Sequence, residues 1–190
     1  MSVTALVLAA GAASRFGRPK QLELLDGQSL VARALAAAAP ADERLVLLGS
    51  SATLIRPTVE RAAPTARIAV VDGWRAGMGR VLAAGIQLLP PGTEAVVILL
   101  ADQPFVTAEA VRNVIDTWRT SGVDWVCAGY GDRRGHPHLF GARWFDVLAT
   151  LEGDDGARAV TRDARPTVVP VDGDDADIDR QSDLDSLVSD

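Results

Sequence analysis

The stretch LVLAAGAASRFGRPKQLELLDG, residues 6–27, begins as an apolar run that breaks at Gly11. Three cations, Arg15, Arg18 and Lys20, follow within nine residues of that glycine, and Lys20 is the only lysine in the chain. A loop of small residues exposes backbone N–H groups, which together with cations can surround an anion such as a polyphosphate. The stretch therefore predicts a buried strand that runs into an anion-binding loop.

Apolar runs and helix-like segments alternate along the first 122 residues. The runs are continuously apolar, as expected of strands that are buried on both faces, and they lie at 4–10, 44–49, 67–71 and 95–101. The helix-like segments lie at 28–39, 53–63, 77–89 and 107–122. This alternation predicts a mainly parallel sheet with helices on both sides, that is, a three-layer Rossmann-like α/β fold.

The second half of the chain is less regular. We expect strands at 123–131 and 166–171, helices at 142–151 and 154–164, and a short closing helix from 182. The chain contains no internal repeat, linker or low-complexity tract that separates two units. A length of 190 residues suits one hydrophobic core, so we predict a single domain over residues 1–190.

Charge and composition exclude several classes of protein. The net charge is −6 and no segment is strongly basic, which argues against nucleic acid as a partner. No apolar stretch approaches the roughly 18–20 residues of a membrane span, and no secretory signal is evident. The single cysteine, Cys127, lies in an apolar stretch and cannot form an internal disulfide. We therefore expect a cytoplasmic protein without a membrane partner.

Acidic residues follow two extended segments. Asp102 closes the apolar run at 95–101, and parallel α/β sheets bind ligands at the carboxyl ends of their strands. A carboxylate in that position can hold a divalent cation, although it can also simply cap the next helix. Asp177 and Asp179 flank Ile178, so on an extended segment both point to one face. One of them is a candidate second carboxylate, and the alternative is an ordinary acidic surface.

Two further positions are candidates for ligand contacts. Gly77 lies just before the helix-like segment 77–89, which indicates either a plain turn or a helix N-terminus that faces a ligand. His136 lies between a glycine and a proline, so its ring either reaches a pocket or is structural. His, Cys and Glu are too few for a zinc site, and no Ser or Cys has a recognisable nucleophile setting.

Six motifs carry a family resemblance that covers nearly the whole chain. In order they are LAAGAASRFGRPKQL (8–22), GWRAGMG (73–79), LLADQP (99–104), GHPHLF (135–140), GDDGAR (153–158) and DIDRQSDL (177–184). Together they resemble the MobA-like nucleotidyltransferase family, and the branch of molybdenum cofactor cytidylyltransferases in particular. Three positions depart from the family: Asp72 stands where asparagine is common, Arg80 where serines are usual, and Arg180 where threonine or serine is usual.

The resemblance implies a magnesium-dependent enzyme that transfers CMP from CTP to molybdopterin, a phosphorylated pterin, and releases pyrophosphate. It implies catalytic roles for Lys20 and Asp102, a Mg²⁺ site at Asp102 and Asp179, and an acceptor contact at His136. The nucleotide-binding residues that it implies are Ala9, Ala10, Gly11, Arg15, Lys20, Asp72 and Gly77. Because the second pKa of a phosphate monoester is about 6, the acceptor is already anionic at neutral pH and needs charge neutralisation rather than a general base.

Several alternatives stay open at this point. Ala10 favours CTP, since cytidylyl-transferring relatives read A-A-G here and guanylyl-transferring relatives, which use GTP, read A-G-G. The acceptor could be another phosphorylated compound, such as a sugar or a hydroxy acid. The chain could also be a non-catalytic chaperone that binds nucleotide or cofactor and serves a molybdoenzyme. Turnover separates these classes, because only an enzyme releases pyrophosphate.

Overall fold

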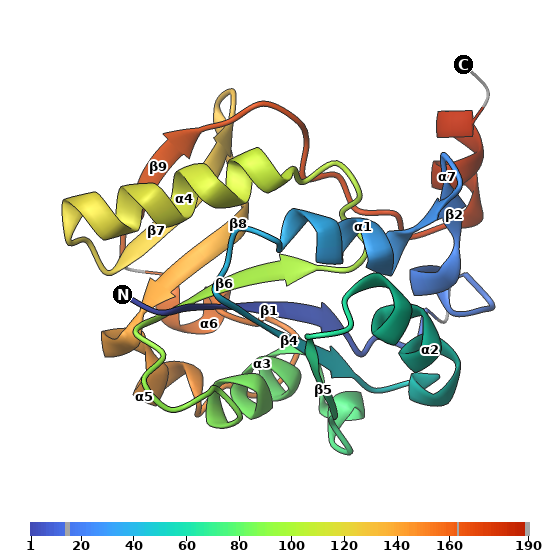
Figure 1. The fold of residues 1–190 in the computed structure, drawn as a ribbon, viewed down its shortest axis with the longest axis horizontal. Helices are drawn as coiled ribbons and strands as arrows, with labels where there is room; N and C mark the ends of the chain where they lie inside the picture. The colour runs from blue at the N-terminus through green and yellow to red at the C-terminus, as the bar shows by residue number, and fades with distance from the viewer. Residues whose placement is uncertain (14–15, 163, 189–190) are drawn as a thin grey trace.

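The computed structural model describes residues 1–13, 16–162 and 164–188. Arg15, one of the predicted nucleotide contacts, lies outside these residues. Within them the chain forms a seven-stranded sheet of order β5-β4-β1-β6-β8-β7-β9 (Figure 1). The strands are β1 (Val3–Ala9), β4 (Glu43–Leu48), β5 (Arg67–Val70), β6 (Ala95–Leu100), β7 (Trp125–Tyr130), β8 (Arg133–Gly141) and β9 (Thr167–Pro170), and a separate hairpin consists of β2 (Leu24–Leu25) and β3 (Gln28–Ser29).

Helices follow most strands of the first half. The α-helices are α1 (Leu30–Ala37), α2 (Ala52–Ala62), α3 (Met78–Gln87), α4 (Ala108–Ser121), α5 (Phe145–Leu148), α6 (Arg158–Thr161) and α7 (Gln181–Val188). Short 3₁₀ turns are η1 (Lys20–Leu22), η2 (Trp74–Ala76) and η3 (Ala142–Trp144). Among the described residues, no helix is long and apolar enough to cross a membrane.

The direction of the strands confirms the predicted fold class. β1 pairs in parallel with β4 and with β6, and β4 pairs in parallel with β5. β8 is antiparallel to both β6 and β7, and β9 is parallel to β7. The sheet is therefore mainly parallel, and the carboxyl ends of β1, β4, β5 and β6 meet at one edge.

Two hydrophobic cores make the three layers. Neighbouring residues of a strand point to opposite faces, so Val7 packs with α1, α2 and α4, whereas Leu6 packs with α3 and α5. Figure 1 shows α1 and α4 on one side of the strands and α3 and α5 on the other. Because both faces are covered, the central strands are buried, which explains their continuously apolar sequences.

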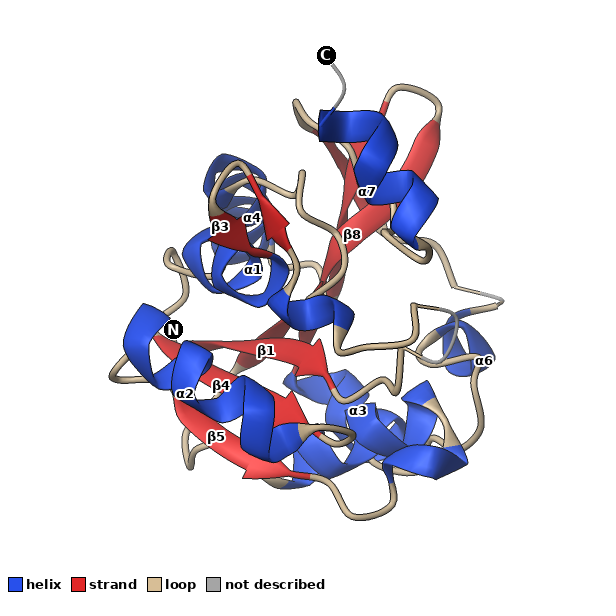
Figure 2. Cartoon of the chain, turned by 90° about the vertical axis from the view of Figure 1, so that its right-hand side faces the viewer, coloured by secondary structure: helices blue, strands red, loops and turns tan. Residues whose placement is uncertain are grey.

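A third, smaller core joins the two ends of the chain. Phe16 and Leu25 from the first loop and hairpin pack against Ile178 and Leu184 from the C-terminal segment. The helix α7 therefore lies beside β2, far from it in sequence (Figures 1 and 2). This contact brings the acidic motif at 177–184 next to the cation-rich loop.

The helices of the second half are shorter than the sequence predicts. The segment 142–151 forms η3 and α5, which together end at Leu148, and α6 covers four residues of the segment 154–164. Glycines explain the second difference, because Gly153 and Gly156 adopt positive φ angles of 67° and 54° and keep the chain in turns until Arg158.

Candidate functional site

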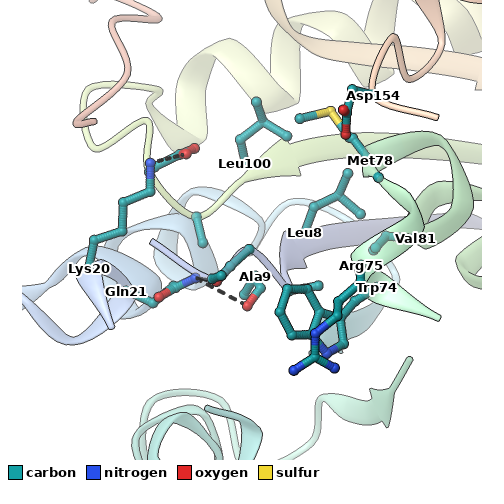
Figure 3. A pocket seen from close by; sticks show the side chains of 16 residues that line it. Leu8, Ala9, Lys20, Gln21, Trp74, Arg75, Met78, Val81, Leu100 and Asp154 are labelled. Carbon is teal, nitrogen blue, oxygen red and sulfur yellow. Dashed lines mark hydrogen bonds and ion pairs between the residues drawn. The ribbon is translucent and has the colours of Figure 1, made fainter. Parts of the chain in front are cut away.

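A cavity of about 340 Å³ opens at the carboxyl ends of β1 and β6 (Figure 3). Parallel sheets bind ligands at this edge, so its position agrees with the expectation from sequence. Six predicted site residues line it: Ala9, Ala10, Gly11, Lys20, Gly77 and Asp102. In Figure 3, Lys20 and Gln21 lie at one end of the cavity, and Trp74 and Arg75 lie at the other.

Three of the predicted site residues that the structure describes do not line the cavity. Asp72 is exposed beyond the end of β5 and does not line the cavity. His136 lies on β8, also outside the lining, with its ring centroid 4.8 Å from that of His138. Asp179 does not line the cavity either, but its carboxylate contacts Lys20, which does.

An ion-pair cluster forms the first end of the cavity. The Lys20 Nζ lies 2.8 Å from Asp102 Oδ2 and 2.9 Å from Asp179 Oδ1, and it also donates to the carbonyl oxygen of Ile178 at 2.9 Å. Lys20 is only 9% exposed. Of the two carboxylates that flank Ile178, that of Asp179 shares Lys20 with Asp102.

The surroundings of this cluster shift two pKa values. Burial by itself lowers the pKa of Lys20, but the charge of Asp102 and hydrogen bonds to Asp102 and Asp179 outweigh it, so the pKa is raised. Burial, followed by repulsion from Asp102, raises the pKa of Asp177. Lys20 is therefore a firmly protonated cation, and excess negative charge collects around it.

The two carboxylates fit a divalent cation. Oxygens of Asp102 and Asp179 already converge on one cationic atom, the Nζ of Lys20. Magnesium is commonly held by one or two carboxylates while phosphates and water supply the other ligands. Among the described residues, no group of three or more His, Cys, Asp and Glu could hold a metal ion. The site therefore suits a cation that is coordinated partly by phosphate oxygens rather than by protein side chains alone.

An aromatic wall forms the second end of the cavity, and the sequence analysis missed it. Trp74 and Arg75 both line the cavity, and the Arg75 Cζ lies 4.4 Å from the Trp74 ring centroid. A Cβ added to Gly49 would come within 2.7 Å of the Trp74 Cγ and of the Ala10 carbonyl oxygen. Gly49 therefore lets η2 pack against the first loop. The available signal was an aromatic residue in the loop after β5, at the ligand-binding edge of a parallel sheet.

Gly77 joins two of the sequence motifs. Its φ is 106°, and an added Cβ would lie 2.4 Å from the carbonyl carbon and oxygen of Gly153. The next turn is fixed by the N–H of Gly79, which donates to the Gly153 carbonyl at 2.7 Å. The start of α3 and the segment 153–158 therefore form one wall, to which Asp154 contributes a lining carboxylate.

Gln21 holds the first loop to the strand that precedes it. Its Nε2 donates to the carbonyl oxygens of Ala9 at 3.3 Å and Gly11 at 3.0 Å. The N–H of Ser50 donates to the Ala10 carbonyl at 3.0 Å. Consecutive carbonyl groups are thus turned toward the protein, and the backbone of the loop is fixed where it borders the cavity.

The two histidines form a neutral pair. Burial is the main reason that the pKa of His138 is lowered to about 4, and it lowers the pKa of His136 well below its ordinary value. Nearby Arg158 lowers both pKa values further. Trp125 Nε1 donates to His138 Nδ1 at 3.3 Å, which fixes that nitrogen as an acceptor.

We expect the free energy of unfolding to fall as the pH is lowered from about 6.5 to 4. In this range the unfolded chain protonates His136 and His138, whereas the folded chain keeps them neutral, so acid favours unfolding. Each histidine contributes up to about 1.4 kcal/mol per pH unit. Urea denaturation at several pH values measures the slope, and a His136→Gln, His138→Gln double variant should show a shallower one. An equal pH dependence of stability in both proteins would contradict the conclusion that the folded protein keeps the two histidines neutral.

Comparison with known proteins agrees with the geometry. Residues 5–168 match the family described as MobA-like NTP transferase domain. The structure of an Rv0371c homolog from Mycobacterium sp. strain JC1 is 34% identical with a TM-score of 0.85, over 98% of this chain and 96% of that one. The structure of Rv0371C from Mycobacterium tuberculosis H37Rv, a complex with manganese, is 28% identical with a TM-score of 0.80, over 98% of each chain.

A longer curated relative matches as well. The bifunctional protein GlmU of Corynebacterium diphtheriae is 29% identical over 164 residues, which are 82% of this chain and 34% of GlmU. This chain thus spans about a third of the length of the curated relatives that it matches. The family match covers the carboxyl ends of β1 and β6, which border the cavity, and confirms the resemblance seen in the motifs. This chain belongs to the MobA-like NTP transferase family of nucleotidyltransferases.

Proposed function

We propose that the protein transfers CMP from CTP to molybdopterin and releases pyrophosphate. The observation that carries this proposal is the division of the cavity into an ionic end and an aromatic end. A triphosphate suits the end where Lys20 and Asp102 meet, and a nucleobase suits the wall with Trp74. Stacking of a base on an aromatic ring contributes about 1–3 kcal/mol, and it leaves the choice of base to other contacts.

The proposed reaction is an in-line displacement at the α-phosphorus of the nucleotide. A phosphate oxygen of the acceptor forms the new P–O bond, and the bond to the β-phosphate breaks, so that the electron pair leaves with pyrophosphate. The acceptor oxygen is already anionic, so no residue has to remove a proton. The task of the protein is to align the two substrates and neutralise charge, which agrees with an ion cluster as its main polar feature.

The roles of single residues follow from their positions. Lys20 neutralises the phosphates, together with Arg15 and the backbone of Ala9, Ala10 and Gly11. Asp102 and Asp179 hold the divalent cation, for which we propose Mg²⁺. When bound, that cation polarises phosphoryl oxygens and stabilises charge on the leaving group.

The remaining assignments concern the nucleoside and the acceptor. Gly77 brings the start of α3 against the nucleoside, and Asp72 contacts it only if the loop after β5 moves inward, because Asp72 is exposed. His136 contacts the acceptor as a neutral hydrogen-bonding group. The preference for CTP over GTP rests mainly on Ala10, and the GHP and GDDGAR elements at 135–137 and 153–158 also favour it. The product would pass to a molybdoenzyme or its chaperone.

A transfer assay tests the proposal. The protein is incubated with Mg²⁺, molybdopterin and either CTP or GTP, and both pyrophosphate and the nucleotide-linked pterin are measured by mass spectrometry. We expect product with CTP. Product with GTP alone would move the protein to guanylyl transfer. Nucleotide binding without pyrophosphate for either nucleotide would contradict the proposal and favour another acceptor or a non-catalytic binder.

A further inference from the structure

We infer that the ammonium group of Lys20 holds the metal position in the free protein, and that a divalent cation enters only when Lys20 moves from the carboxylates to a triphosphate. This inference rests on the proposed nucleotide site. It gives Lys20 two alternating partners, the carboxylate pair of Asp102 and Asp179 and the phosphates of the nucleotide. Metal and nucleotide binding are therefore strongly coupled.

The contacts of Lys20 show that it has to rearrange before it can bind a triphosphate. An ammonium group has three N–H donors and no acceptor. In the structure Nζ has three oxygen partners within 2.9 Å, namely Asp102 Oδ2, Asp179 Oδ1 and the Ile178 carbonyl oxygen. No donor is left for a phosphate. To bind a triphosphate, Lys20 must give up at least one of its present contacts.

Repulsion between positive charges also separates Lys20 from a metal ion at the two carboxylates. A cation that contacts both Asp102 Oδ2 and Asp179 Oδ1 competes with Nζ for the same two oxygens. Mg²⁺ binds oxygens at about 2.0–2.1 Å, so an ammonium and a metal ion in this space would repel each other at contact distance. A metal ion without nucleotide has to displace a buried ammonium from both of the carboxylates that it pairs with. A triphosphate supplies another anion for the ammonium to pair with.

The exchange needs only a side-chain movement. The backbone of Lys20 is held in η1, where the N–H of Glu23 donates to the Lys20 carbonyl at 3.0 Å, and the next residue, Gln21, is tied to Ala9 and Gly11. The four-carbon stem of lysine is flexible, and its ammonium is a point charge without a fixed bonding plane. Figure 3 shows the extended Lys20 side chain along the cavity wall, so a rotation about its stem redirects Nζ.

Manganese binding without nucleotide tests the inference directly. Free Mn²⁺ is measured by electron paramagnetic resonance during titration of the wild-type protein and of Lys20→Met, which keeps most of the stem and removes the charge. We expect Lys20→Met to bind Mn²⁺ at least about tenfold more tightly, because a cation at contact distance has been removed. Equal or weaker binding by Lys20→Met, with the fold intact, would overturn the inference.

The matched control is Arg18→Met. Arg18 belongs to the same loop and also loses one positive charge in this variant, but its guanidinium pairs with Glu23 and Gln181 rather than with the carboxylate pair. Mn²⁺ affinity should stay within about twofold of wild type, since exposed charges are largely screened. An increase as large as that of Lys20→Met would mean that general charge, not the position of Nζ, sets the affinity.

A second measurement uses the unaltered protein, in case Lys20→Met fails to fold. Because the chain has one lysine, ¹³C labelling of the lysine ε-carbon gives a single resonance next to Nζ to follow by NMR. We expect little change with millimolar Mg²⁺ alone and a clear shift with Mg²⁺ and CTP together. A shift with Mg²⁺ alone, or none while calorimetry shows Mg²⁺–CTP binding, would overturn the inference. The Mn²⁺ titration uses no nucleotide or acceptor. Its result therefore tests the inference about Lys20 independently of the proposed transfer reaction.

Discussion

Asp102→Asn is expected to lower pyrophosphate release by at least about a thousandfold. The variant loses a ligand of the divalent cation that would stabilise charge on the reacting phosphates. Asparagine keeps the size of the side chain but loses the negative charge that pairs with Lys20 at 2.8 Å. In the free protein, Lys20 would keep Asp179 and the Ile178 carbonyl as partners, so the fold should persist. Turnover is measured with CTP, Mg²⁺ and molybdopterin.

Asp116→Asn is a suitable control for this prediction. Asp116 is a carboxylate on α4 that pairs with the neighbouring Arg119 at 3.9 Å and does not line the cavity. Its replacement should leave turnover within about twofold of wild type, as surface substitutions usually do. If Asp102→Asn had wild-type stability and retained more than about a tenth of wild-type turnover, Asp102 could not be a metal ligand in the reaction.

Gly77→Ala is expected to lower the free energy of unfolding by about 3 kcal/mol, which is large for a single methyl group. Two costs add at this position. The φ of 106° is strained for any residue with a Cβ, and the new methyl would lie 2.4 Å from the backbone of Gly153. The wall between α3 and the segment 153–158 has to open, so nucleotide affinity should fall as well. Urea denaturation followed by circular dichroism gives the stability.

Gly92→Ala separates the two costs. Gly92 also has a positive φ, 81°, but an added Cβ there meets no atom within 4 Å. This variant should therefore show the backbone strain alone, about 1 kcal/mol. If both variants lost the same free energy of unfolding, the close contact between Gly77 and Gly153 would not be maintained in solution.

The central sheet could be predicted because its strands are buried on both faces. The runs at 44–49 and 95–101 correspond to β4 and β6, since burial on both sides leaves only apolar residues in them. The order of the strands could not be predicted, because β8 inserts between β6 and β7 as an antiparallel strand. No local feature of the sequence specifies the pairing of β8 with β6.

The site was predictable where it depends on strand ends and not where it depends on long-range packing. Asp102 and Gly11 border the cavity because each follows a parallel strand. The contact of Lys20 with Asp179 spans 159 residues and depends on α7 packing beside the hairpin. Trp74 was missed because a single aromatic residue after a strand is more often part of a core.

Calorimetric titration of the wild-type protein with CTP and GTP, each with and without Mg²⁺, tests the central claim most directly. The claim is that the cavity beside Lys20 and Asp102 binds a metal–triphosphate complex. We expect selective binding of CTP, at least about tenfold tighter with Mg²⁺ than without it. Absence of binding by either nucleotide in the presence of Mg²⁺ would contradict the account.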